Sequence, residues 1–250
     1  MPDAPSGAAV VNGIAYVGLV TDNPVGSGLF AFDAATGAQL WSAPISSNDA
    51  ASSPALANGV VYISGGSLFA FNAKTGALLW SSSIFGGGIT APAVVGGVVF
   101  SAGSALAALN AKTGAVIWSA SLGGALLFDS PAVANGTVYI GGTLGNTPKQ
   151  TGVLYAVNAR TGKLVWSAPL DNSEIDSSPS VANAVVYIGT DGGTLYAFNA
   201  RTGARLAAVA GVSGQSSPTV ANGMVYSEDQ NGVLFALGLG TEATGRHGSP

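Results

Sequence analysis

The chain has 250 residues, of which 48% are hydrophobic and 8% are charged, and it carries a net charge of −4. This acidic balance argues against nucleic-acid binding, which requires clustered Lys and Arg, and the absence of cysteine excludes disulfides, thiolate metal sites and thiol nucleophiles. Glycines and prolines interrupt the apolar stretches before they reach the roughly 20 residues of a spanning helix, so we expect no membrane span.

Six related units follow one another along the chain, and each is predicted to form four short strands. In the fifth unit the strands are expected at 179–182, 185–189 and 194–199, with a fourth after the turn at 201–203. The Asn-Gly dipeptides between the first two strands of most units are a strong hairpin signal, and no segment has a sustained 3.6-residue apolar period, so no helix is expected. We expect units at 6–47, 48–86, 87–124, 125–172, 173–211 and 212–241 in a single domain at 1–241, with a disordered tail at 242–250.

All four tryptophans occupy the same place in an eleven-residue pattern, in which Ala is followed six residues later by Gly and ten residues later by Trp. The copies are Ala31–Gly37–Trp41, Ala70–Gly76–Trp80, Ala108–Gly114–Trp118 and Ala156–Gly162–Trp166. Four-stranded repeats of about 40 residues are typical of propeller blades. The sequence therefore predicts an all-β propeller of about six four-stranded antiparallel blades. The last blade is expected to be incomplete. Either it has three strands or the chain is part of a larger propeller, and of the two we expect six blades that close into a ring.

The phrase Leu-Tyr-Ala-Phe-Asn-Ala-x-Thr-Gly, followed in most units by Trp, resembles the tryptophan-docking motif of the PQQ-repeat, or quinoprotein-type, propellers. The resemblance extends from about Ser6 to Leu237. In that family the Ala and Trp of the motif lock adjacent blades, with the ring stacked on a peptide plane of the neighbouring blade. The resemblance therefore implies a structural docking role for Trp41, Trp80, Trp118 and Trp166. It also implies a periplasmic or extracellular protein of bacterial type, although residues 1–5 do not have the features of a signal peptide.

Acidic and basic residues are predicted to lie on opposite faces of the propeller. The acidic face is expected to carry Asp22, Asp49, Asp129, Asp171, Glu174, Asp176, Asp191, Glu228 and Asp229, and the other face Lys74, Lys112, Arg160, Lys163, Arg201 and Arg205. One interpretation is that loops simply collect charges. The other is that Asp22, Asp49, Asp129, Asp176, Asp191 and Asp229 bind a cationic ligand, a divalent ion or a basic protein segment.

Metal sites have weak support in this sequence. Asp171, Glu174 and Asp176 could offer oxygen ligands to calcium, but the stretch lacks the spacing and glycine of an EF-hand loop. Asp191-Gly192-Gly193 and Asp229-Gln230-Asn231-Gly232 are interpreted as ordinary turns. We therefore predict no metal and no cofactor, with calcium as the one ion considered and PQQ not expected.

No catalytic constellation is found. Quinoprotein dehydrogenases of the family hold PQQ beside calcium, with an adjacent-cysteine disulfide and a stacking tryptophan, and this chain has no cysteine and no tryptophan outside the docking pattern. The single histidine, His247, falls in the expected tail, so neither a Ser-His-Asp triad nor a histidine zinc site is predicted. We expect a non-catalytic binding or scaffolding propeller whose loop faces recognise a protein, small-molecule or glycan partner. The alternative is a degenerate quinoprotein that binds PQQ or serves an oxidoreductase. The insertion at 144–151 is the best single contact candidate.

Overall fold

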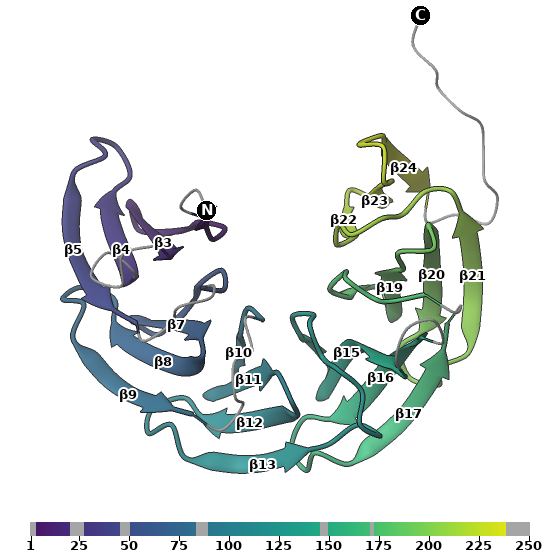
Figure 1. The fold of residues 1–250 in the computed structure, drawn as a ribbon, viewed down its shortest axis with the longest axis horizontal. Coiled ribbons are helices and arrows are strands. Elements are labelled where there is room, and N and C mark those ends of the chain that lie inside the picture. Colours follow the sequence, from purple (N-terminus) through teal and green to yellow (C-terminus); the bar gives the residue numbers. More distant parts are fainter. Residues whose placement is uncertain are drawn as a thin grey trace, which may run out of the picture.

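The computed structural model describes residues 4–20, 28–45, 51–83, 90–145, 150–170 and 173–238. In these ranges the chain forms antiparallel strands and no helix, grouped into six consecutive sheets. The sheets follow one another around an arc, with the early strands of each sheet inside and the last strand outside (Figure 1). This confirms the predicted all-β propeller with six blades. The described residues contain no helix long and apolar enough to cross a bilayer.

The strands of the six blades have the following bounds. Blade 1 contains β1 (Ala4–Pro5), β2 (Ala9–Val11), β3 (Ile14–Val20), β4 (Gly28–Asp33) and β5 (Gln39–Pro44). Blade 2 contains β6 (Ala55–Ala57), β7 (Val60–Gly65), β8 (Ser67–Asn72) and β9 (Leu78–Ser82). Blade 3 contains β10 (Ala93–Val95), β11 (Val98–Ala102), β12 (Leu106–Asn110) and β13 (Val116–Ala120). Blade 4 contains β14 (Ala132–Ala134), β15 (Thr137–Leu144), β16 (Thr151–Asn158) and β17 (Leu164–Pro169). Blade 5 contains β18 (Ser180–Ala182), β19 (Val185–Gly189), β20 (Thr194–Asn199) and β21 (Arg205–Ala210). Blade 6 contains β22 (Thr219–Ala221), β23 (Met224–Glu228) and β24 (Leu234–Gly238).

The hairpin between the first two strands of a blade uses a tight turn with two residues at positive φ. In blade 2 these are Asn58 (φ 51°) and Gly59 (φ 74°), the conformation that favours Asn-Gly. In blade 5 the second position is Ala184, at φ 60°. An L-residue with a Cβ is strained in this region, so this turn keeps the shape of the repeat without its usual glycine.

A register shift in the third strand of a blade aligns the Ala and Trp of the sequence pattern. In blade 2 the shift falls between Ala70 and Phe71, and Ala70 pairs with Trp80 on the outer strand. The same shift occurs in blades 1, 3, 4 and 5. Such bulges re-aim side chains. The constant spacing between Ala and Trp in the repeat therefore places these two residues opposite each other on neighbouring strands.

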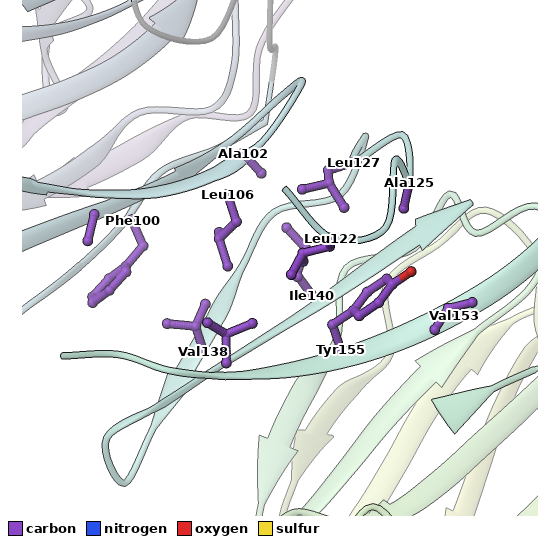
Figure 2. Packing of buried hydrophobic residues seen from close by; sticks show 12 residues of the cluster. Phe100, Ala102, Leu106, Leu122, Ala125, Leu127, Val138, Ile140, Val153 and Tyr155 are labelled. Carbon is purple, nitrogen blue, oxygen red and sulfur yellow. The ribbon is translucent and has the colours of Figure 1, made fainter. Parts of the chain in front are cut away.

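Each sheet buries alternate residues against its two neighbours, because successive side chains of a strand point to opposite faces. In blade 2, Ile63 and Phe71 pack with residues of blade 1, whereas Leu68 and Ala70 pack with residues of blade 3. Figure 2 shows the equivalent core between blades 3 and 4, where Leu106 lies among side chains of both sheets. The core is thus a series of layers between blades.

The insertion in the fourth unit lengthens a hairpin. β15 and β16 have eight residues each and stay paired as far as Leu144 and Thr151. Residues 146–149 at the tip of the predicted contact loop lie outside the described residues. The tail predicted at 242–250 also lies outside them.

The expected closure into a ring is wrong. Blades 1 and 6 face each other across the opening of the arc (Figure 1). Blade 6 has three strands in the described part of the chain, and β1 pairs with β3 of its own sheet instead of completing blade 6. The five junctions between successive sheets do not bring the sixth sheet back to the first (Figure 1).

Candidate functional site

Each tryptophan docks on the blade that follows it. The indole Nε1–H donates to the carbonyl oxygen of the alanine that follows the third strand of the next blade. The pairs are Trp41 with Ala73 (3.1 Å), Trp80 with Ala111 (3.0 Å), Trp118 with Ala159 (3.0 Å) and Trp166 with Ala200 (3.1 Å). We call the turn that receives the ring the docking pocket of that blade.

The docking pocket requires a glycine for two reasons. Gly76 of blade 2 has φ +72°, and a Cβ built on it would lie 2.6 Å from Cε3 of Trp41. Asn72 fixes the turn, because its Oδ1 accepts from the backbone N–H groups of Lys74 and Thr75 at 3.0 Å each. The Asn, Thr and Gly of the repeat therefore shape a flat backbone surface for the ring.

Tyrosines on the second strands reinforce three of these junctions. The hydroxyl of Tyr16 donates to the same Ala73 carbonyl as Trp41, at 3.1 Å, and the two rings are tilted at 5.9 Å. Tyr62 and Tyr139 do the same at their own junctions. The alanine carbonyl is thus a shared acceptor, which sequence reasoning missed.

Blade 1 has the same docking pocket, but none of the described residues fills it. Ala34 N donates to Gly13 O at 2.8 Å, as Ala73 N does to Gly59 O at 2.9 Å, and Gly37 has φ +73°. Yet no described residue has an atom within 4 Å of a Cβ built on Gly37. Ala34 is exposed, whereas Ala73 is buried. The backbone of the pocket is therefore formed without its tryptophan.

The sheet around this empty pocket is also uncovered. We call the side of blade 1 that is turned away from blade 2 the N-terminal face of the arc. Val10 is 61% exposed on it, and its counterpart Leu56 in blade 2 packs on the core shared with blade 1. Four other residues of the N-terminal face are half-buried, whereas their counterparts in blade 2 are buried. They are Ala15, Val17, Phe30 and Phe32.

Blade 6 exposes the complementary side. We call its surface turned away from blade 5 the C-terminal face of the arc, formed by Tyr226, Leu234 and Ala236. Leu234 is 66% exposed, but the leucine at the same place in blade 2, Leu68, is 1% exposed. The two ends of the arc therefore present the two halves of the interface that the internal junctions bury.

A ladder of serines ties the inner edges of the blades together. Ala91 N donates to Ser130 Oγ at 2.9 Å, Ser130 N to Ser178 Oγ at 3.0 Å and Ser178 N to Ser217 Oγ at 2.9 Å. These serines each precede the proline that opens a unit. The Ser-Pro dipeptide was the signal available in the sequence, although its role depends on the next blade.

The residue before this serine position normally carries a buried hydroxyl. Ser52, Thr90 and Ser177 each accept from a backbone N–H of their own second strand, namely from Ser64, Ala102 and Gly189. Blade 4 has Asp129 at this place. Asp129 is 4% exposed, and its Oδ2 has no hydrogen-bond partner among the described residues. Blade 4 thus holds a carboxyl where its neighbours hold a hydroxyl.

Three further carboxylates gather next to this position, between blades 4 and 5. Oxygen atoms of Glu174, Asp176 and Asp191 lie within 4.8 Å of one another. Asp191 N donates to Glu174 O at 3.1 Å, and the Gln150 amide donates to Glu174 Oε1. We call Asp129, Glu174, Asp176 and Asp191 the acidic cluster.

Two carboxyls of the acidic cluster have pKa values above the ordinary value of Asp. Burial raises the pKa of Asp129 to about 8, and the negative charges of Asp176 and Asp191 add to the increase. Burial also raises the pKa of Asp176, followed by the charges of Asp191 and Glu174. The charged groups that act on both carboxyls are therefore all acidic, and none of these causes is a cation.

The structure describes part of the acidic face that the sequence predicts. It brings Asp129, Asp176 and Asp191 together, but Asp129 is buried and does not form part of an open surface. Oδ1 of Asp229 accepts hydrogen bonds within its own turn, from Asn231 N at 2.8 Å and Val233 N at 2.9 Å. Three other candidates, Asp22, Asp49 and Asp171, lie outside the described residues.

Comparison with solved structures supports the fold. BamB from Moraxella catarrhalis is similar, with a TM-score of 0.56 and 19% identity, and the match covers 92% of this chain and 84% of that one. The computationally designed protein Ika8 gives a TM-score of 0.74 at 17% identity, covering 93% and 70%. Quinohemoprotein alcohol dehydrogenase from Comamonas testosteroni gives 0.70 at 19% identity, covering 93% and 45%. The chain therefore spans less than half of that dehydrogenase.

Comparison with protein families is more specific. No curated protein matches the sequence. The family model described as outer membrane protein assembly factor BamB matches residues 5–83 and 149–246. These ranges contain more than half of the chain and include blades 1 and 2 and most of the strands of blades 4 to 6. The chain therefore belongs to the PQQ-repeat propeller family that carries the BamB description.

Proposed function

We propose that this chain is a non-catalytic, protein-binding scaffold of the extracytoplasmic space, and that a second copy of the chain docks on the ends of its arc. The observation that carries the proposal is the pair of uncovered apolar faces at the two ends of the arc, where Val10 of blade 1 is 61% exposed and Leu234 of blade 6 is 66% exposed. Membership of a family described by an outer membrane assembly factor supports a scaffolding role and a location outside the cytoplasm.

The two open faces complement each other within one molecule. At the junction of blades 1 and 2, Leu29 of the first sheet packs against the core that contains Ile63 and Phe71 of the second. On the open faces, Leu234 occupies the place of Leu29, and Val17 and Phe32 occupy the places of Ile63 and Phe71. Blade 6 of one copy and blade 1 of another thus repeat an interface that the fold already builds, and such head-to-tail contacts are heterologous.

One polar contact is also available at this interface. Tyr226 lies on the C-terminal face at the position of Tyr16, Tyr62 and Tyr139, whose hydroxyls donate to an alanine carbonyl of the next blade. The carbonyl of exposed Ala34 is the equivalent acceptor on the N-terminal face. A second copy would therefore supply both apolar burial and a hydrogen bond, as the internal junctions do.

Molar mass measured by light scattering across a protein concentration series tests the proposal. We expect the wild-type chain to associate, and the variants Val10→Glu and Leu234→Glu to remain monomeric. Both positions are exposed in the single chain, so the folds of the variants should be intact by circular dichroism. Leu79→Glu is the matched control, because Leu79 is 50% exposed on outer strand β9, away from both ends, and it should associate like wild type.

Two results would count against the proposal. A wild-type chain that stays monomeric at all concentrations would remove the second copy as partner, as would end-face variants that associate as strongly as Leu79→Glu. Thermal unfolding with added PQQ separately tests whether the chain binds PQQ. An increase in Tm with PQQ would favour the degenerate quinoprotein instead.

A further inference from the structure

We infer that the acidic cluster between blades 4 and 5 is a binding site for a divalent cation of the calcium type, with Glu174, Asp176 and Asp191 as ligands and Asp129 as the buried carboxyl beside them. This site belongs to the middle of the arc and is independent of the end faces.

The ligand set has the chemistry that calcium prefers. Calcium takes six to eight oxygen ligands, chiefly from carboxylates, backbone carbonyls and water. Glu174, Asp176 and Asp191 provide carboxylate oxygens within 4.8 Å of one another, which is close enough for one ion to contact all three. The absence of nitrogen or sulfur donors from the cluster disfavours zinc and other soft metals.

Two carboxylate atoms in the cluster are buried without a partner. Oδ2 of Asp129 and Oδ1 of Asp191 have no hydrogen bond among the described residues and no contact with solvent. Buried polar atoms are normally satisfied, and an exception requires an explanation such as a bound ion. Asp129 is 4% exposed, so bulk solvent does not reach its unpartnered oxygen.

Asp129 lies against the segment that carries the ligands. A Cβ built on Gly141 would meet Asp129 Oδ2 at 2.6 Å and Ile175 Cγ2 at 2.7 Å. Ile175 stands between Glu174 and Asp176 in the chain, so the carboxyl of Asp129 and this segment occupy the same side of β15. Only a glycine at 141 leaves room for both. The substitution of the usual Ser or Thr by Asp129 thus adds negative charge at one place in the repeat.

The supporting backbone is held from several elements. Ile175 N donates to Thr143 Oγ1 at 3.2 Å, and Asp191 N donates to Glu174 O at 3.1 Å. The amide of Gln230 donates to Asp191 O. Blades 4, 5 and 6 therefore all contribute to fixing the ligand segments before an ion binds, which reduces the ordering cost of binding.

Calorimetric titration of the chelator-treated full chain with CaCl₂ tests the inference. We expect saturable binding with one ion per chain, and a Tm that increases with CaCl₂ but not with NaCl of equal ionic strength. Asp176→Asn and Asp191→Asn should weaken calcium binding about tenfold or more, as the loss of groups that hold or support a metal commonly does. Glu228→Gln is the control, since it removes one exposed negative charge outside the cluster and should leave the affinity unchanged.

Loss of binding in these variants cannot be confused with loss of fold. Each substitution relieves repulsion between like charges, so the metal-free variants should be at least as stable as metal-free wild type. The inference is overturned if the wild-type chain takes up no calcium at about 5 mM, above the range of weak extracellular sites. An equal response of Tm to NaCl, or equal affinity in Asp176→Asn and wild type, would overturn it as well.

Discussion

The outer and inner rims of the arc depart from the repeat in different ways. At the outer rim, the docking pocket of blade 1 has the same backbone hydrogen bond and positive-φ glycine as that of blade 2, but no described tryptophan fills it. At the inner rim, the hydroxyl of Ser177 in blade 5 is replaced in blade 4 by the carboxyl of Asp129. The first departure leaves apolar surface exposed, and the second buries a charge. Departures from an otherwise regular repeat therefore mark both sites that we assign to binding.

The largest change in stability is expected for Asp129→Asn at the inner rim, measured in the presence of a chelator. The folded-state pKa of Asp129 is about 8 against an ordinary value of 3.8, so the folded state holds a proton that the unfolded state has released. Asp129 should therefore make stability fall as pH rises between about 4 and about 8, and it contributes a slope of at most about 1.4 kcal/mol per pH unit. The variant removes this slope.

Chemical denaturation at several pH values measures this effect. Wild type and Asp129→Asn should have similar free energies of unfolding at about pH 4 and diverge progressively toward pH 8, with the variant more stable. Ser177→Ala is a useful contrast, because it changes the equivalent place in blade 5 without a titrating group. Parallel pH profiles for wild type and Asp129→Asn would show that the carboxyl is not buried as described.

At the outer rim, Trp80→Ala should destabilise the chain by about 3 kcal/mol, since it removes a large ring and its hydrogen bond to Ala111. Leu79→Ala, on the same strand but 50% exposed, should change stability by less than about 0.5 kcal/mol. The measurement is urea denaturation followed by circular dichroism. If the two variants lose equal stability, the tryptophan does not lock the junction.

The filled and empty pockets can be compared directly by placing alanine in each. Gly76→Ala introduces a Cβ at positive φ and against Trp41, whereas Gly37→Ala introduces it at positive φ alone. The backbone strain should cost about 1 kcal/mol in both, and the clash about 2 kcal/mol more in Gly76→Ala. Urea denaturation at low protein concentration measures the difference. Equal losses would mean that the blade 1 pocket is covered in solution.

The smallest effect concerns a departure from the repeat that carries no proposed site. Ala184 stands at φ 60° in the hairpin of blade 5, where blade 2 has Gly59 at φ 74°. Ala184→Gly should stabilise the chain by about 0.5 to 1 kcal/mol, because the strain of a Cβ at this φ is removed. Asn183 and the turn type remain the same. A loss of stability measured by thermal unfolding would show that the turn is not under strain.

The sequence by itself determined the repeat, the four-strand blades and the docking role of the motif. These features are local: Asn-Gly hairpins, a period-two apolar pattern and the spacing between Ala70 and Trp80 are fixed within about 40 residues. The strands expected at 185–189 and 194–199 match β19 and β20 for this reason. The family resemblance followed from the same local pattern and is confirmed by the family match.

Only the tertiary structure decided how the blades turn and which carboxyls meet. The rotation between two sheets depends on the volumes of the side chains packed between them. Its effect accumulates over five successive junctions, so the blades form an arc and not the expected ring. Asp129 and Asp191 are far apart in sequence and come together because blades 4 and 5 are neighbours. The burial of Asp129 depends on Gly141 and Ile175 from other segments, so only the tertiary structure shows it.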